Sequence, residues 1–532
     1  MSRMTGGKAA VEMLIRAGVD TVFGIPGVHT LDIYDELYEY RDEIKHIVTR
    51  HECGAGFMAD GFARASGQIG VALVITGPGV TNAATALGEA WADSSPLLMI
   101  SSQNRTEYMD RDIGALHQLK DQLAVTDGCT AYNHRVEDPA EIPQAIADAM
   151  TYLKTHRPRP VHIDIPLDLL AAEAAMEFPE ISPTSFTPTD EEMEKVKHML
   201  ENSSRPVMWL GGGAADASGE LTHLAEKLDA AVVNTCAGKG AVPEDMPNNL
   251  GNNLRSDDLQ AFLDSCDLVL AVGTELSVRE TSRGEMSLPK PMIRVDVDAP
   301  GSHGLFDPEL EIRSDCREFA RRLTKIVEGM DDQENKPEFM EEVQDLRAKL
   351  RDENTSRGDG EIRAIVDIMQ QTLQPEDVVV CDMTMLCYRA SSLYEALQPR
   401  TFLFPRGFGT LGWSMPAAIG AKLAQPEKNV VSLCGDGGFM FTAQELATAV
   451  KYDLGLPIVV LNNERYGVVA RNQERNYGRT IGVDISNPDF VQFAESFGAR
   501  ARRLTDPAQL PAALNESFAA DSPTLIEFQV DF

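Results

Sequence analysis

The stretch that most constrains the fold is residues 430–464, with the sequence VVSLCGDGGFMFTAQELATAVKYDLGLPIVVLNNE. A short apolar run, a glycine-rich turn, a helical pattern and a second apolar run follow one another in it. Short continuous apolar runs are typical of strands buried on both faces of a parallel sheet. The segment therefore predicts a strand-helix-strand unit, and the capping-box spacing of TAQE predicts that its helix starts near Thr442.

The turn and the second apolar run place polar groups at one edge of that sheet. Three glycines allow a tight turn and close approach of the backbone to a ligand: Gly435, Gly437 and Gly438. Asp436 ends the first run and Asn463 the second, so a crossover connection brings both to the carboxyl edge. Helix-start amides favour phosphate there, and carboxylate, amide and backbone carbonyl oxygens suit Mg²⁺. The segment predicts a diphosphate held through a divalent cation.

Length and charge exclude several other classes of protein. A chain of 532 residues suggests roughly three domains. Its formal charge of −34 argues against nucleic acid or an anionic membrane as a partner, because either would be repelled. No apolar run is long enough to span a membrane and no signal peptide is recognisable, so a cytoplasmic location is expected. The acidic composition is also compatible with a salt-rich cytoplasm.

Glycine and proline breaks between apolar runs divide the chain into three α/β blocks. The expected boundaries are 1–172, a linker at 173–190, 191–330, an acidic linker at 331–360, and 361–532. Buried strands are predicted at residues 21–25, 71–76, 97–101, 161–166, 206–214, 230–234, 268–273, 293–298, 377–382, 430–434 and 457–463. The expected fold is α/β with three doubly wound parallel-sheet domains. The glycine turn at 211–214 lacks the GxGxxG pattern, which favours a structural turn over an FAD or NAD site.

GDG followed by NN at this distance resembles the signature of thiamine diphosphate (ThDP) enzymes, specifically the 2-oxo acid decarboxylase and acetolactate synthase-like family. Four further segments resemble family segments in the family's order: FGIPG at 23–27, RHECGAGFMADG at 50–61, TGPGVTN at 76–82 and GFGTLGWSMPAAIG at 407–420. The resemblance implies a pyrimidine-binding domain, a central domain and a diphosphate-binding domain, in that order. It also implies a homodimer or homotetramer with each active site between two subunits.

The resemblance assigns roles to individual residues. It implies Mg²⁺ ligands from the side chains of Asp436 and Asn463 and the backbone carbonyl of Arg465. Glu52 matches the carboxyl group beside the cofactor's pyrimidine, where it favours the tautomer that removes the thiazolium C2 proton. Leu411 matches the residue wedged between the cofactor rings, and the Gly409 carbonyl matches the acceptor for the 4′-amino group. The other cofactor contacts implied are Asn82, Gly435, Gly437, Gly438, Tyr466, Gly467 and Val468.

Two histidines and a glutamine are candidates for contacts with the reacting face of the cofactor. Asn82 and Gln118 match positions near that face in acetolactate synthases, while His117 replaces an aromatic residue there. An imidazole at His117 can shuttle protons, although a structural histidine is an equally good interpretation. His29, after the first-domain Pro-Gly turn, is the other candidate, again with a structural alternative.

Differences from known family members narrow the choice of reaction that this chain is expected to catalyse. Val28 and Val469 stand where pyruvate decarboxylases carry acids, and the Gln-Trp pair of acetolactate synthases is missing. FGIPGVHT at 23–30 and LHQLKDQ at 116–122 resemble 5-guanidino-2-oxopentanoate (2-ketoarginine) decarboxylases. We therefore expect non-oxidative decarboxylation of a 2-oxo acid, with Glu275 as a candidate partner for a cationic tail. The alternatives are an acetolactate synthase-like carboligase, a flavin-dependent oxidase, and a ThDP-binding subunit without turnover.

Overall fold

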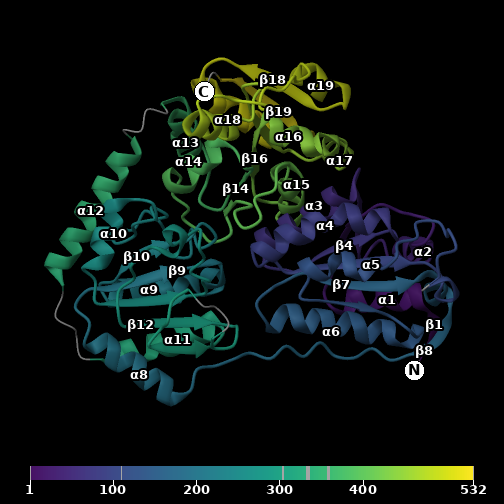
Figure 1. Ribbon diagram of the computed structural model, residues 1–532, viewed down its shortest axis with the longest axis horizontal. Coiled ribbons are helices and arrows are strands. Elements are labelled where there is room, and N and C mark those ends of the chain that lie inside the picture. The colour runs from purple at the N-terminus through teal and green to yellow at the C-terminus, as the bar shows by residue number, and fades with distance from the viewer. Residues whose placement is uncertain (1, 110, 302–304, 331–335, 356–359, 531–532) are drawn as a thin grey trace. The chain divides into compact units, whose positions relative to one another are not determined.

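A computed structural model describes residues 2–109, 111–301, 305–330, 336–355 and 360–530. The chain forms two compact units, the first of residues 1–184, 378–384 and 405–532, and the second of residues 185–377 and 385–404. Both are built from parallel sheets with helices packed on them (Figure 1). Among the described residues, no helix has the length and apolar character needed to cross a membrane.

The N-terminal part of the first unit is a parallel sheet with strand order β3-β2-β4-β5-β7-β6. Its strands are β2 (Thr21–Gly24), β3 (Lys45–Val48), β4 (Gly70–Val74), β5 (Leu97–Gln103), β6 (Tyr132–Arg135) and β7 (Val161–Pro166), with a separate antiparallel pair β1 (Ser2–Thr5) and β8 (Glu173–Met176). Its helices are α1 (Gly6–Arg16), α2 (Leu31–Glu39), α3 (Glu52–Ser66), α4 (Pro78–Ala92), α5 (Gln122–Thr126), α6 (Ile142–Thr155) and α7 (Leu167–Ala171). In Figure 1, α3 and α4 lie on one face of this sheet and α6 on the other.

The C-terminal part of the first unit has parallel strands in the order β14-β16-β17-β19-β18. They are β14 (Val378–Cys381), β16 (Val430–Gly435), β17 (Pro457–Asn462), β18 (Arg500–Leu504) and β19 (Thr524–Gln529). Its helices are α15 (Ser414–Ala424), α16 (Asp436–Thr442), α17 (Leu446–Lys451), α18 (Gly467–Tyr477), α19 (Phe490–Ser496) and α20 (Leu510–Phe518). Glycines let α15 pack closely on α3, since a Cβ at Gly420 would lie 1.9 Å from the Met58 carbonyl oxygen.

The second unit contains a parallel sheet with order β10-β9-β11-β12-β13. Its strands are β9 (Pro206–Leu210), β10 (Ala231–Asn234), β11 (Leu268–Val272), β12 (Met292–Asp296) and β13 (Leu310–Arg313), with the short β15 (Phe402–Leu403) elsewhere in the unit. Its helices are α8 (Asp190–Glu201), α9 (Ser218–Lys227), α10 (Asp257–Asp264), α11 (Cys316–Glu328), α12 (Pro337–Thr355), α13 (Gly360–Thr372) and α14 (Met385–Leu393). The α/β fold with three parallel sheets is confirmed.

Continuous apolar runs identified strands well. Each predicted run forms one: β2, β4, β5, β7, β9, β10, β11, β12, β14, β16 and β17. Sequence patterns missed edge strands such as β3, with sequence KHIV, and β18, with sequence RARRL, because an edge strand is covered on fewer sides and keeps charged residues.

A 3-10 helix, Ala443–Glu445, begins after Thr442 near the predicted start and leads into α17, but the expected capping box does not form. Helix α16 already begins at Asp436, and Thr442 is its last residue. The Thr442 hydroxyl donates to the Gly412 carbonyl at 2.7 Å rather than capping a helix. The capping-box spacing was therefore coincidental, and the helix amides begin directly at the glycine turn.

The stretch 331–360 is predicted to be an acidic linker, and its residues 331–335 and 356–359 lie outside the described part. Helix α12 does form, but one face of it is buried. Val343 and Leu350 join an apolar cluster with β9 and α10, and Phe339 stacks on Phe262 with ring centroids 5.8 Å apart. An apolar face at helical spacing outweighs the acidic composition here.

This packing predicts a measurable loss of stability. Phe339→Ala is expected to lower the free energy of unfolding of the second unit by about 3 kcal/mol, because a large buried ring leaves a cavity. Denaturant unfolding of the variant measures the loss, with the exposed Glu341→Ala on the same helix as control. Equal stabilities of the two variants would contradict burial of this face.

Candidate functional site

The carboxyl edge of the C-terminal sheet carries a buried aspartate. Asp436 lies where β16 passes into α16 and is 3% exposed. Its Oδ2 accepts a hydrogen bond from Asn487 Nδ2 at 2.8 Å, and the backbone N–H groups of Gly437, Glu464 and Arg465 also donate to the carboxylate. Burial raises the pKa of Asp436, and these hydrogen bonds counteract the rise. The ends of β16 and β17 therefore meet at one edge, as a crossover connection requires.

The loop after β17 supplies further oxygen atoms beside Asp436. Asn462 Oδ1 accepts from Asn487 Nδ2 at 2.9 Å and from the Glu464 backbone N–H at 3.2 Å. The neighbouring Asn463 is half-buried, and the Arg465 carbonyl accepts from the Gly467 N–H at 2.9 Å. A buried carboxylate next to a loop with amide and carbonyl oxygens is a hard-donor set that fits Mg²⁺.

Two positions of the glycine turn have no room for a side chain, because neighbouring residues lie too close. A Cβ at Gly437 would lie 2.6 Å from the Tyr466 ring, and one at Gly438 would lie 3.1 Å from the Asp382 carboxyl group. Any larger residue would displace these side chains. Tyr466, Gly467 and Val468 are half-buried around the start of α18, on the same side as the turn.

The loop carrying Gly409 and Leu411 is held by side chains that sequence reasoning did not identify. The Gly412 N–H donates to Asp382 Oδ2 at 3.0 Å, and Gly412 itself has a positive φ of 81°. Burial raises the pKa of Asp382 to about 6, against opposing backbone hydrogen bonds. The Thr410 N–H donates to Glu89 Oε2 at 3.1 Å. Leu411 itself is half-buried.

Trp413 ends this loop and connects it to a buried charge cluster. Its indole N–H donates to Asp60 Oδ2 at 2.7 Å, and the Arg64 guanidinium lies 4.7 Å from the indole ring. Arg64 also pairs with Asp60 at 2.9 Å and with Asp93 at 2.8 Å. Helix α3 therefore fixes the direction of the loop through buried, charge-assisted contacts.

Glu52 is the first residue of α3 and stands at the carboxyl edge of the N-terminal sheet. Its Oε2 accepts a hydrogen bond from Asn82 Nδ2 at 2.9 Å, while Oε1 takes no hydrogen bond within the described residues. His51 caps the helix, since its Nδ1 accepts from the Cys53 N–H at 3.1 Å. The structure thus joins Glu52 and Asn82, and gives His51 a structural role.

His29 and His117 form a pair near the same edge. His29 Nδ1 lies 3.0 Å from the Thr76 hydroxyl, which in turn lies 3.1 Å from the Ser102 hydroxyl. The two imidazole rings stand edge to face with centroids 5.5 Å apart. Burial, and then the proximity of His117, lowers the pKa of His29. His29 is therefore favoured as a neutral imidazole oriented by Thr76.

Other candidate residues have more local roles or lie elsewhere. Gln118 Oε1 accepts from the Ala115 N–H at 2.9 Å, and its amide donates to the Arg111 carbonyl, so Gln118 shapes its own loop. Glu275 is half-buried in the second unit, after β11. The glycine turn after β9 packs tightly on the loop after β11, where the Gly213 N–H donates to the Gly273 carbonyl at 3.1 Å.

Asn487 is the residue whose role sequence patterns missed most clearly. It lies in the loop before α19, outside any strand-end motif, and one amide nitrogen bridges Asp436 and Asn462. With ThDP and Mg²⁺ held as the family resemblance implies, Asn487→Ala is expected to weaken binding of ThDP by about 10-fold to 100-fold, as for partners that orient metal ligands. Titration calorimetry at fixed Mg²⁺ measures this, with the exposed Gln492→Ala on α19 as control. Unchanged affinity would show that Asp436 needs no such support.

Comparison with known proteins gives consistent matches over the whole chain. Models of thiamine pyrophosphate enzymes match the N-terminal TPP binding domain at residues 4–125, the central domain at 193–323 and the C-terminal TPP binding domain at 382–528. A probable 2-ketoarginine decarboxylase of Pseudomonas aeruginosa is 40% identical over 99% of this chain and 94% of its own length.

Acetolactate synthases are similar over the same span at lower identity. The probable large subunit of Methanocaldococcus jannaschii is 32% identical over 99% of this chain and 92% of its own length. The isozyme 2 large subunit of Escherichia coli is 31% identical over 99% of this chain and 96% of its own length.

Proposed function

The chain belongs to the thiamine pyrophosphate enzyme family, and we propose that it is a Mg²⁺-dependent decarboxylase that converts a 2-oxo acid into an aldehyde and CO2. The observation that carries the proposal is the 40% identity, over 99% of the chain, to a probable 2-ketoarginine decarboxylase. The proposed substrate is 5-guanidino-2-oxopentanoate, which would give 4-guanidinobutanal and CO2.

The C-terminal half-site would hold the diphosphate and the cation. In this proposal Asp436, Asn463 and the Arg465 carbonyl bind Mg²⁺, while the amides at the start of α16 face the diphosphate. Beginning α16 at Asp436 supports this role, because the positive end of the helix dipole favours an anion there. The Gly409 carbonyl and the Leu411 side chain would orient the rings, and their loop is held by Asp382.

The N-terminal half-site would handle protons. When bound, ThDP supplies the carbon that adds to the 2-oxo group and takes up the electron pair left by departing CO2. Glu52 holds a proton at a carboxyl oxygen and exchanges it with the pyrimidine; its orientation by Asn82 leaves Oε1 for that contact. His29 is proposed to act beside it with His117, oriented by Thr76.

We propose a homodimer or homotetramer in which each site combines half-sites of two subunits. Within the described residues, no hydrogen bond or ion pair joins Glu52 to Asp436 or to the 463–468 loop. Large apolar side chains are exposed in loops and helices near both half-sites: Val28, Leu31, Leu116, Met440, Phe441, Val469 and Ile481. Burial of these side chains against a second subunit would remove apolar surface from water, which supports pairing of the half-sites across subunits.

The second candidate is an acetolactate synthase-like carboligase, favoured by full-length similarity of 30 to 32% to several such subunits. A panel of 2-oxo acids, assayed for CO2, aldehyde and acyloin, decides between them. Equimolar aldehyde and CO2 from 2-ketoarginine supports the proposal. Acetolactate from pyruvate with no aldehyde from 2-ketoarginine would refute it, and a purified protein carrying bound flavin would point to an oxidase.

A further inference from the structure

A buried glutamate of the C-terminal part binds the backbone that precedes Glu52. Glu445 ends the 3-10 helix Ala443–Glu445 and is 0% exposed. Its Oε1 accepts from the His51 N–H at 2.9 Å, and both carboxylate oxygens lie 3.1 Å from the Arg50 nitrogen. The Thr448 hydroxyl donates to Oε2 at 2.8 Å. The carboxylate therefore accepts hydrogen bonds from two backbone N–H groups just before Glu52 and from one neighbouring hydroxyl group.

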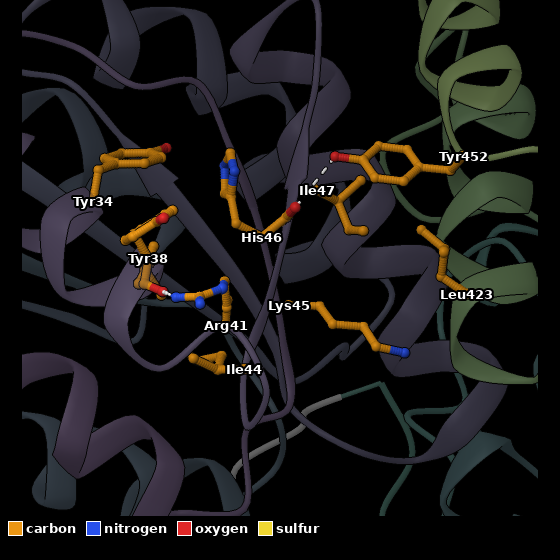
Figure 2. Close-up of a pocket in the computed structure, with 10 residues that line it drawn as sticks. Tyr34, Tyr38, Arg41, Ile44, Lys45, His46, Ile47, Leu423 and Tyr452 are labelled. Atoms are coloured by element: carbon orange, nitrogen blue, oxygen red, sulfur yellow. Dashed lines mark hydrogen bonds between the residues drawn. The ribbon is translucent and has the colours of Figure 1, made fainter.

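Tyr452, from the same segment, and Thr448 continue this contact along β3. The Val48 N–H donates to the Tyr452 hydroxyl at 2.8 Å, and that hydroxyl donates to the His46 carbonyl at 3.2 Å. Figure 2 shows Tyr452 reaching His46 beside a surface cavity of about 530 Å³. The Thr448 hydroxyl also lies 3.4 Å from the Val48 carbonyl. Since β3 is an edge strand, its outward N–H and C=O groups need such partners.

The contact reaches the first turn of α3. A Cβ at Gly54 would lie 2.2 Å from Glu445 Oε1, so the carboxylate fills the space under that turn and any larger residue there would displace it. Burial raises the pKa of Glu445 to about 7, while hydrogen bonds from Thr448, Arg50 and His51 oppose the rise. Burying the Glu445 carboxylate therefore carries a considerable desolvation penalty, which an exposed carboxylate would not have.

We propose that Glu445 is a positioning residue for Glu52: its carboxylate fixes the Arg50 and His51 amides and thereby the start of α3, from which the Glu52 side chain extends. This inference rests on the role proposed above for Glu52. A shift of the Arg50–His51 backbone would move the Glu52 carboxyl group by a similar amount, and proton transfer is sensitive to such displacements.

The test uses Glu445→Gln in the full-length protein. In the cofactor-free protein, amide hydrogen exchange of Arg50 and His51 is expected to accelerate by about tenfold or more, because a charge-assisted acceptor is lost. With ThDP and Mg²⁺ at saturation, deuterium exchange at cofactor C2 should slow by about tenfold. The affinity for ThDP should change far less, since Asp436 and its loop are untouched.

Glu244→Gln is the matched control, because Glu244 is a buried glutamate of the second unit that accepts from the Ala396 N–H at 2.7 Å. It should alter neither readout. Unchanged Arg50 and His51 exchange in Glu445→Gln, or accelerated amide exchange without slower C2 exchange, would overturn the inference. If Glu445→Gln does not fold, Thr448→Val should accelerate the same amides more weakly, and no acceleration would overturn it. Glu52→Gln separates the two failures: unchanged C2 exchange in that variant overturns the role of Glu52, whereas slow exchange in Glu52→Gln with the parent rate in Glu445→Gln overturns only the inference about Glu445.

Discussion

Glu52→Gln is expected to slow deuterium exchange at C2 of bound ThDP by roughly 100-fold or more, the usual contribution of a positioned acid-base group. Glutamine keeps the size of the side chain, and its carbonyl can still accept the hydrogen bond that Asn82 donates at 2.9 Å. It cannot take up or release a proton. The substitution therefore separates proton transfer from packing, and acid-quenched NMR of the cofactor measures the exchange rate directly.

Three controls make this result specific. The affinity for ThDP should stay within about tenfold, since the diphosphate half-site is unaltered and one lost hydrogen bond is worth about 1 kcal/mol. The thermal unfolding midpoint of the cofactor-free protein should match that of the parent. The exposed Glu43→Gln in the same domain should exchange at the parent rate. Normal C2 exchange in Glu52→Gln would remove this carboxyl group from the mechanism and favour a binding subunit without turnover.

The sequence allowed the backbone frame of the site to be predicted because strand ends follow simple rules. Apolar runs located β16 and β17, and parallel crossover topology then required Asp436 and the loop after Asn462 to share one edge. Glu52 was identified differently, through the resemblance of residues 50–61 to a family segment, because the preceding strand β3 was missed. The strand-end predictions depend on the order of elements along the chain, which the sequence displays directly.

Supporting contacts could not be predicted in the same way. Asn487 reaches Asp436 across 51 residues of chain, and Glu445 reaches His51 across 394. Neither pair has a fixed spacing, because each contact depends on how separate loops pack. The TAQE motif shows the difficulty: its spacing matches a capping box, but its glutamate binds another part of the fold. Hydrogen-bond partners of buried acids need coordinates to be identified.

Asp436→Asn is expected to weaken binding of ThDP with Mg²⁺ by ~100-fold or more, because even partners that only orient metal ligands are worth 10-fold to 100-fold. Asparagine removes the negative charge that a divalent cation requires. Calorimetric titration with Mg²⁺, and separately with the larger and more weakly hydrated Ca²⁺, measures the loss.

The stability of the cofactor-free Asp436→Asn protein should not fall along with its affinity for ThDP. Burial raises the pKa of Asp436 in the folded protein, so the folded state binds the proton more tightly than the unfolded chain does. This tighter proton binding stabilises the folded protein at pH values below the pKa of Asp436 in the unfolded chain. The stabilisation is lost as pH rises through the pKa of Asp436 in the folded protein. At neutral pH the charged carboxylate therefore opposes folding, and Asp436→Asn should unfold at the same temperature as the parent or a higher one. If the variant loses stability together with affinity, Asp436 is a structural residue. If it keeps its stability while its affinity collapses, the charge of Asp436 is retained for the cation.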